Sequence, residues 1–221
     1  MPKTEEFKNT KTHTVYRLSD GTRVPGVTTI LNVLDKPALI HWAWKLGCDG
    51  IDYRKYRDAT AEVGTLAHYL VECDLAGTEP DLTAYSQETI NKAENCLISY
   101  YEWRKDKTVE PILVEEALVS EKYGYGGTCD FYGYINGTLC LADLKTGKAI
   151  YPEMIHQLAA YRQLLEENDY PLQGVRILRI GRDETEGFEE RVKTKKELKP
   201  HWKIFKACLD IYNEKKKIKE G

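Results

Sequence analysis

Two aspartates and a lysine near the middle of the chain have the types and spacing that metal-assisted chemistry needs. Asn136-Gly137 separates two β-type runs and predicts a hairpin with a type I′ turn. Counting outward from a two-residue turn, Asp130 faces Asp143 across the strand pair. Like charges placed opposite one another destabilise a strand pair, and a divalent cation with oxygen ligands would offset their repulsion.

Lys145 lies two residues beyond Asp143 and therefore points to the same face of the strand. A carboxylate-bound cation beside an ammonium group suits phosphodiester hydrolysis. The ion positions and acidifies a water and neutralises the phosphate, while the lysine steers the nucleophile or stabilises the transition-state charge. The alternative is an ordinary ion pair between Asp143 and Lys145, with Asp130 in solvent.

Four short blocks surround these residues and follow one another along the chain. They are Gly64-Thr65-x-x-His68, Gly127-Thr128-Cys129-Asp130, Asp143-Leu144-Lys145-Thr146-Gly147 and Gln157-x-x-x-Tyr161. Together, over roughly residues 60 to 165, they resemble the RecB-like branch of the PD-(D/E)XK nuclease superfamily. That branch includes phage-type exonucleases and the mitochondrial genome maintenance-type exonuclease.

The resemblance implies an enzyme with a restriction-endonuclease-like core and one or two Mg²⁺ or Mn²⁺ ions. In that family Asp130 and Asp143 would be catalytic metal ligands, the Leu144 carbonyl a further ligand and Lys145 the catalytic lysine. His68 would add a metal ligand from a helix. Asp143 stands where many members have Glu, and its side chain is shorter. The four cysteines that hold an iron–sulfur cluster in some relatives are absent, so no cluster is expected.

Supporting roles are less specific. The resemblance assigns Gln157 and Tyr161 to DNA binding and to support of the site, although ordinary helix packing with hydrogen-bonded tips explains them too. Glu72 follows His68 by one helical turn and could orient its imidazole. On the strand before the hairpin only one of two neighbouring glutamates, at positions 115 and 116, can face the site. The sequence does not say which, and Glu116 is our candidate for support, beside Glu72.

On the residues alone, His68 has a plainer interpretation, because a lone helical histidine is commonly a core or surface residue. Gly64 lies one turn earlier, and its missing side chain would let this helix approach the sheet closely.

Helices and strands must position these residues. Hydrophobic periodicity, caps and turn residues predict helices over 37–47, 59–76, 86–107, 152–168 and 199–219, and strands over 12–18, 109–120, 128–135, 138–145, 175–180 and 188–192. This order predicts a single α/β nuclease domain over 1–221, with a mixed central β-sheet flanked by helices and an N-terminal helical region. Within it we expect a loose tail over 1–12, the core sheet and helix over 109–180, and a basic C-terminal helix over 191–221.

Composition narrows the function classes. The 221 residues are 42% hydrophobic and 30% charged, which excludes a wholly disordered chain. Neither a secretory signal nor an apolar run of about 18 residues is present, so we expect no membrane partner and a cytoplasmic location, in a bacterial or phage-infected cell. The net charge of -3 argues against a general nucleic-acid coat protein. The segment from Arg191 onward is nevertheless basic, which suits a polyanion that contacts one face, or a solubilising tail.

The leading hypothesis is a metal-dependent DNA nuclease, more an exonuclease than an endonuclease, in DNA recombination, repair or phage replication. One alternative is a DNA-binding or assembly module that keeps the fold without cutting. Another is an RNA-directed nuclease, because no residue here distinguishes ribose from deoxyribose. Digestion polarity, preference for single strands or duplex ends, oligomeric state and any recombinase or helicase partner stay open.

Overall fold

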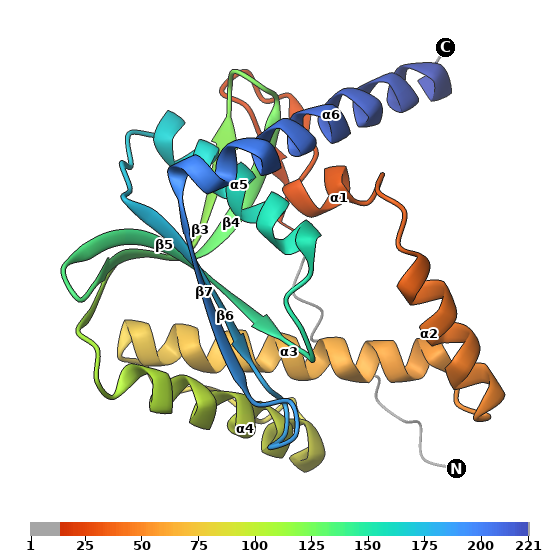
Figure 1. Ribbon diagram of the computed structural model, residues 1–221, viewed down its shortest axis with the longest axis vertical. Coiled ribbons are helices and arrows are strands. Elements are labelled where there is room, and N and C mark those ends of the chain that lie inside the picture. The colour runs from red at the N-terminus through yellow and green to blue at the C-terminus, as the bar shows by residue number, and fades with distance from the viewer. Residues whose placement is uncertain (1–13, 221) are drawn as a thin grey trace.

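The computed structural model describes residues 14–220, and Figure 1 shows the arrangement of their elements. The helices are α1 (Val27–Leu31), α2 (Pro37–Cys48), α3 (Tyr53–Ala76), α4 (Gln87–Arg104), α5 (Pro152–Glu167) and α6 (Lys195–Glu220). The strands are β1 (Tyr16–Arg17), β2 (Arg23–Val24), β3 (Val109–Ser120), β4 (Tyr125–Ile135), β5 (Thr138–Thr146), β6 (Gly174–Ile180) and β7 (Phe188–Thr194). The loose tail expected over 1–12 lies outside the described residues, as does the start of the first expected strand.

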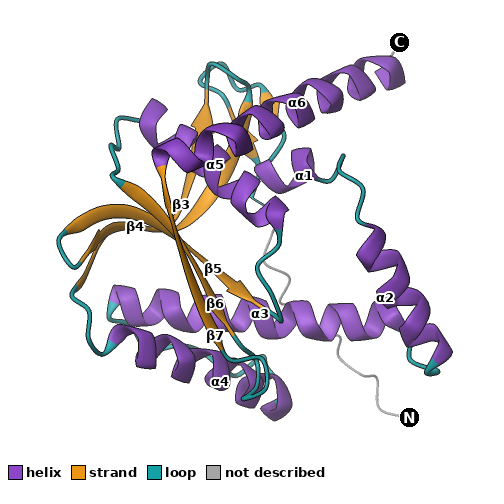
Figure 2. Cartoon of the chain, viewed as in Figure 1, coloured by secondary structure: helices purple, strands orange, loops and turns teal. Residues whose placement is uncertain are grey.

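The central sheet has the strand order β3-β4-β5-β6-β7. Neighbouring strands are antiparallel except β5 and β6, which are parallel and are connected through α5. A parallel pair requires a crossover of this kind, because a tight turn can only reverse the chain. The mixed central sheet flanked by helices that the sequence predicts is confirmed (Figure 2).

Helices cover both faces of this sheet. One hydrophobic core contains Leu141 of β5 together with Leu158 of α5 and Phe205 of α6. The other core contains Ala142, the next residue of β5, together with Leu66 of α3. Since successive strand residues point to opposite faces, β5 is buried on both sides, which explains its nearly continuous apolar sequence. Within residues 14–220, no helix combines the length and the hydropathy needed to cross a membrane.

The hairpin forms as predicted and then forks. Asn136 and Gly137 have φ values of 49° and 72°, as a type I′ turn requires. Pairing between β4 and β5 runs from Ile135–Thr138 to Phe131–Ala142 and ends there. Beyond that point β4 pairs with β3 and β5 pairs with β6, so the two strands diverge (Figure 2). The fork opens directly beside Asp130.

Several element ends differ from the prediction for local reasons. The helix α3 begins at Tyr53, six residues earlier than expected, because the Asp52 carboxylate accepts a hydrogen bond from the Arg54 amide and caps it. The helix α6 begins four residues early, because Thr194 and Glu197 exchange side-chain and backbone hydrogen bonds in a capping box. The five-residue helix α1 was not predicted, because no side chain caps it.

Gly64 lets α3 approach β5, as expected from its missing side chain. A Cβ atom at Gly64 would lie 2.8 Å from Thr146 Oγ1, closer than nonbonded atoms tolerate. We expect Gly64→Ala to lower the free energy of unfolding by about 1–3 kcal/mol in urea denaturation, because α3 must shift. Adding Thr146→Ala removes the clashing oxygen and should recover most of that loss.

The matched control is Gly47→Ala on α2, where an added Cβ meets no atom within 4 Å. There the same substitution should stabilise by up to about 1 kcal/mol, since alanine loses less backbone entropy in a helix. Equal effects of the two substitutions would contradict the close approach of α3 to the sheet.

Candidate functional site

Residues from both sides of the fork meet where β4 and β5 separate. Asp130 Oδ2 accepts a hydrogen bond of 2.7 Å from the Leu144 amide, so the carboxylate bridges the gap between the strands. On β5, Lys145 Nζ lies 2.6 Å from Asp143 Oδ2. Asp130 and Asp143 therefore share one site, but not as the laddered pair that the hairpin register predicted. Strand divergence relieves the close carboxylate contact that such pairing would impose.

The helix α3 adds His68 to this site. Its Nδ1 lies 3.6 Å from Asp130 Oδ2 and 4.0 Å from Glu115 Oε1. One ligand atom from each of these three side chains falls within 4.8 Å of the others, a spacing that could hold one metal ion. Glu72, one turn further along α3, is half-buried, and the ion-pair partners found for His68 are Asp130 and Glu115.

The structure places Glu115 at the site, and not Glu116, the candidate named from the sequence. Glu116 is exposed, whereas Glu115 lies beside His68. Glu115 has a φ of 50°, a left-handed conformation that is uncommon for a residue other than glycine. Strand alternation narrows the choice to one of two neighbours, but it cannot reveal which one the local backbone turns inward. Such strain is typical of sites where the surrounding structure holds a side chain in place for function.

Burial and neighbouring charges shift the pKa values of Asp143 and Asp130 in opposite directions. Asp143 is 1% exposed, and burial followed by the nearby Asp130 charge raises its pKa to about 6 against the opposing effect of Lys145. Burial would also raise the pKa of Asp130, but His68, Lys145 and the Leu144 amide lower it to about 2. Burial disfavours the Lys145 ammonium, yet the two aspartates hold its pKa above the usual value.

The donor set fits a divalent cation. Both Asp143 carboxylate oxygens are buried without a hydrogen bond of good geometry from any described residue, although Lys145 Nζ is in ion-pair contact with one of them. Buried carboxylate oxygens without a donor are costly, and a cation would satisfy them. Asp130, Glu115 and His68 form a separate cluster of two carboxylates and one imidazole, a donor type that suits Mg²⁺ or Mn²⁺. The resemblance implies the Leu144 carbonyl as a further ligand. Leu144 lies beside Asp130, because its amide donates a hydrogen bond to the Asp130 carboxylate.

Gln157 and Tyr161 lie behind this site on α5. Gln157 Nε2 donates a hydrogen bond of 2.7 Å to the Tyr161 hydroxyl. Tyr161 is buried, and burial followed by the Asp143 charge raises the pKa of its phenol well above the usual value. A Cβ atom at Gly127 would lie 2.5 Å from the Tyr161 ring, so this glycine provides space for the ring. Tyr161 therefore lies near the Asp143 carboxylate, and Gly127 makes room for its ring.

A pH-dependent stability follows from Asp143. The pKa of Asp143 is raised in the folded state, so the protonated side chain contributes to the stability of the fold. This contribution is fully present below pH 3.8 and is lost as pH rises through about 6. Asparagine mimics the neutral form at every pH. We expect the free energy of unfolding of Asp143→Asn, relative to the parent protein, to rise by about 1–3 kcal/mol between pH 4 and pH 7 in EDTA.

Urea denaturation at a series of pH values measures this difference. Glu116→Gln changes an exposed carboxylate and should stay within about 0.5 kcal/mol of the parent protein. A relative stability of Asp143→Asn that falls with rising pH would contradict the burial of an unsatisfied carboxylate.

Comparison with known proteins gave structural similarity only. No family model matches the chain, and neither does any curated protein. Among solved structures, a proposed exonuclease from Eubacterium rectale is 15% identical with a TM-score of 0.45, over 66% of this chain and 64% of that one. An alkaline exonuclease from Laribacter hongkongensis is 14% identical with a TM-score of 0.35, over 73% of this chain and 92% of that one.

Proposed function

We propose that the protein is a Mg²⁺- or Mn²⁺-dependent nuclease that hydrolyses DNA phosphodiester bonds. The observation that carries this proposal is the meeting of Asp130, Asp143 and Lys145 at the fork, with both Asp143 oxygens buried and with Lys145 Nζ in ion-pair contact with one of them. A structural ion pair has no need for an additional buried carboxylate and a histidine at the same point. We further propose that the whole chain acts as a single nuclease domain.

Each residue would have a separate role. Asp130, Asp143, Glu115 and His68 would hold the metal, which when bound supplies an acidified water and neutralises the scissile phosphate. Lys145, kept protonated by the aspartates, would donate hydrogen bonds to the attacking oxygen or to the phosphate as charge develops. The Gln157–Tyr161 pair would keep the Asp143 carboxylate in position from behind.

The exonuclease mode and the RecB-like assignment are proposed from the sequence blocks that resemble that branch. The basic helix α6 is a candidate surface for the DNA backbone. Its end carries Lys215, Lys216, Lys217 and Lys219, all exposed, and it extends away from the sheet (Figure 1). Exposed lysines of this kind bind phosphate without reading sequence.

The test is a time course with end-labelled single-stranded, linear duplex and circular DNA, together with matched RNA, in Mn²⁺ and in EDTA. Shortening of linear DNA with circular DNA intact supports the proposed exonuclease. Cleavage of RNA alone would move the substrate class to RNA. No cleavage of any substrate, despite metal binding, would favour a non-cleaving module.

The neighbouring glutamates of β3 provide a sharp comparison. Glu115→Gln is expected to lower the Mn²⁺-dependent cleavage rate about 10- to 100-fold, because it weakens the environment of the metal and of His68. Glu116→Gln removes the same charge one residue away, at an exposed position, and should leave the rate within about twofold. Initial rates on labelled DNA measure both, and equal losses would exclude a specific role for Glu115.

A further inference from the structure

The half of β5 that carries Asp143 and Lys145 is paired on one side. The ladder between β5 and β4 ends at Ala142, whereas the ladder between β5 and β6 continues to Thr146. Among the described strands, β6 is therefore the only ladder partner of residues 143–146. A strand segment with one ladder opens more easily than a segment with two, so its side chains need other contacts to stay in place.

Two hydrogen bonds outside the ladder hold this segment. The Leu144 amide donates one to the Asp130 carboxylate, on the side that β4 has left. The other lies at the end of the strand, where the Gly147 carbonyl accepts a hydrogen bond of 3.1 Å from Arg179 Nη1. Gly147 has a φ of 136°, in the region that favours glycine, and the chain bends there as it leaves β5. Since Gly147 follows Lys145 by two residues, this contact fixes the end of the strand beside the lysine.

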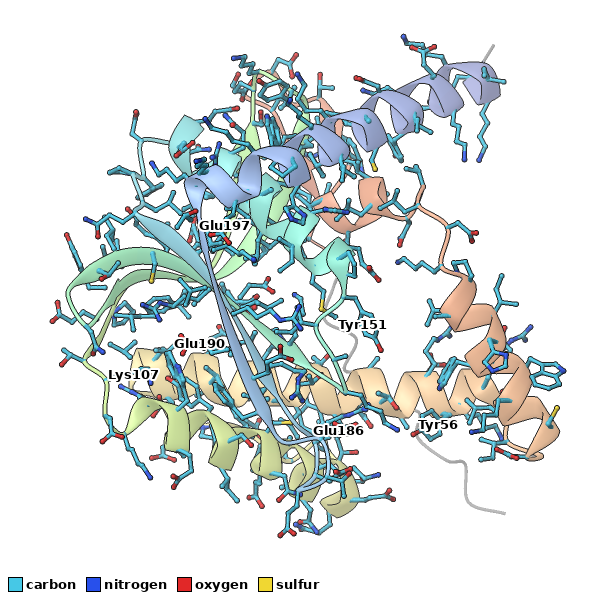
Figure 3. All side chains as sticks on the ribbon, in the orientation of Figure 1. Tyr56, Lys107, Tyr151, Glu186, Glu190 and Glu197 are labelled. Atoms are coloured by element: carbon cyan, nitrogen blue, oxygen red, sulfur yellow. The ribbon has the colours of Figure 1, made fainter. Side chains whose placement is uncertain are left out.

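The Arg179 guanidinium also binds the connection between β6 and β7. Its Nη1 donates to the Glu186 carbonyl at 2.5 Å and to the Gly187 carbonyl at 3.4 Å. This connection, which Glu186 marks in Figure 3, is closed by a hydrogen bond from the Gly181 amide to the Gly187 carbonyl. The side chains of Arg182 and Glu186 pair across it. One arginine therefore ties the end of β5 to a loop that has its own internal contacts.

The burial of Arg179 is costly for the fold. The residue is 7% exposed, and its buried Nε lies 3.5 Å from Glu189 Oε2. Glu189 also pairs with Arg191, so the two arginines share one carboxylate. A buried cation destabilises a fold unless its donors are satisfied, and β6 and β7 already pair through a continuous ladder without it. The contact that this ladder cannot supply is the one to Gly147.

We propose that Arg179 is a positioning residue of the candidate active site. It is the register partner of Lys145 on β6, yet its donors bind backbone carbonyls, whereas the Lys145 ammonium lies on Asp143. Arg179 therefore acts through the backbone: by holding the Gly147 carbonyl, it keeps Lys145 and Asp143 in place. This inference rests on the proposed nuclease function and adds a residue outside the four sequence blocks. Displacement of a reacting group by about 1 Å can slow a reaction about 100-fold.

The experiment compares Arg179 with a second arginine of β6. Arg176 also has a buried Nε and also pairs with a glutamate of β7, Glu190, at 2.7 Å. It precedes Arg179 by three residues, about 10 Å along the strand. Because each Arg→Gln change removes a partly buried ion pair, both variants should melt at a lower temperature than the parent protein.

The kinetics should separate the two arginines. On labelled DNA with Mn²⁺, Arg179→Gln should lower kcat about 10- to 100-fold and leave KM within about threefold, because binding does not need the exact strand position. Arg176→Gln should leave both constants within about twofold. Arg179→Lys keeps a charged donor for the carbonyls, although it lacks the planar fork, and should lose less than about tenfold.

Gly147→Ala tests the same contact from the other side. The φ of 136° is strained for alanine, while the added Cβ meets no atom within 4 Å, so the change acts on the backbone and not on packing. It should lower kcat as Arg179→Gln does. The double variant should lose no more than about twofold beyond the slower single variant, because both changes remove one hydrogen bond. Losses that multiply would overturn a shared path through the Gly147 carbonyl.

Amide hydrogen exchange measures the hold on β5 without any cleavage. In EDTA and without DNA, Arg179→Gln should speed exchange over residues 144–148 about 10- to 100-fold, the effect of losing one hydrogen bond to a charged group. Arg176→Gln should leave exchange over this segment within about twofold. Mass spectrometry of peptides from the full chain gives both values.

Other results would overturn the inference in identifiable ways. Unchanged kcat and unchanged exchange in Arg179→Gln exclude it, even where the parent protein cleaves DNA. Equal losses of kcat in the Arg179 and Arg176 variants would show that both arginines serve stability alone. A parent protein that cleaves no DNA, but whose exchange over 144–148 depends on Arg179 and not on Arg176, would refute the nuclease proposal and leave the hold on β5 intact.

Discussion

Lys145→Met and Asp143→Asn are each expected to lower the Mn²⁺-dependent rate of DNA cleavage by about 100- to 1000-fold or more. Methionine keeps much of the lysine volume but removes the ammonium that lies 2.6 Å from Asp143. Loss of one preorganised charge-stabilising group typically has an effect of this size. Asparagine preserves the shape of Asp143 while removing the negative charge that a cation needs. Single-turnover cleavage of end-labelled DNA measures the chemical step directly.

A loss of activity is informative only where the fold survives. Asp143→Asn removes an ionised group from a buried position, so its melting temperature in EDTA should equal or exceed that of the parent protein. A variant that is stable and inactive supports the assignment. A stable variant that cleaves at the rate of the parent protein would exclude these residues from the reaction.

Addition of Mn²⁺ is expected to raise the melting temperature of the parent protein by about 5–10 °C. An ion at 100 times its dissociation constant stabilises the folded state by about 2.7 kcal/mol, and each kcal/mol shifts the melting temperature of a chain this size by about 2–4 °C. An ion bound at the fork would relieve the repulsion between Asp130 and Asp143 and would satisfy buried oxygens. Differential scanning fluorimetry with EDTA, Mg²⁺ and Mn²⁺ measures the shift.

Two carboxylate variants test whether the rise in melting temperature comes from Mn²⁺ bound at the fork. Asp130→Asn should lose most of it, since Asp130 belongs to the cluster of ligand atoms within 4.8 Å. Glu116→Gln, at an exposed position on the neighbouring strand, should keep it. A shift of the same size in both variants would show that Mn²⁺ binds elsewhere.

Local signals in the sequence predicted most of the fold because they act over a few residues. Asn136-Gly137 specifies its turn through positive φ, and the register follows outward from it as far as Phe131–Ala142. Gly64 predicted a close contact between a helix and the sheet, but the sequence did not identify Thr146 as its neighbour. Helix starts were less accurate, because the caps at Asp52 and Thr194 compete with later residues of similar type.

The local sequence by itself therefore determined the hairpin, its register and the residue types that could bind a metal, because turn chemistry and strand alternation depend only on near neighbours. Only the tertiary structure decided where β4 and β5 part, that Glu115 instead of Glu116 turns inward, and that α2 stays exposed. These outcomes depend on which distant segments compete for the same hydrogen bonds and apolar surface. That competition is settled by packing across the whole sheet, which no short stretch of sequence encodes.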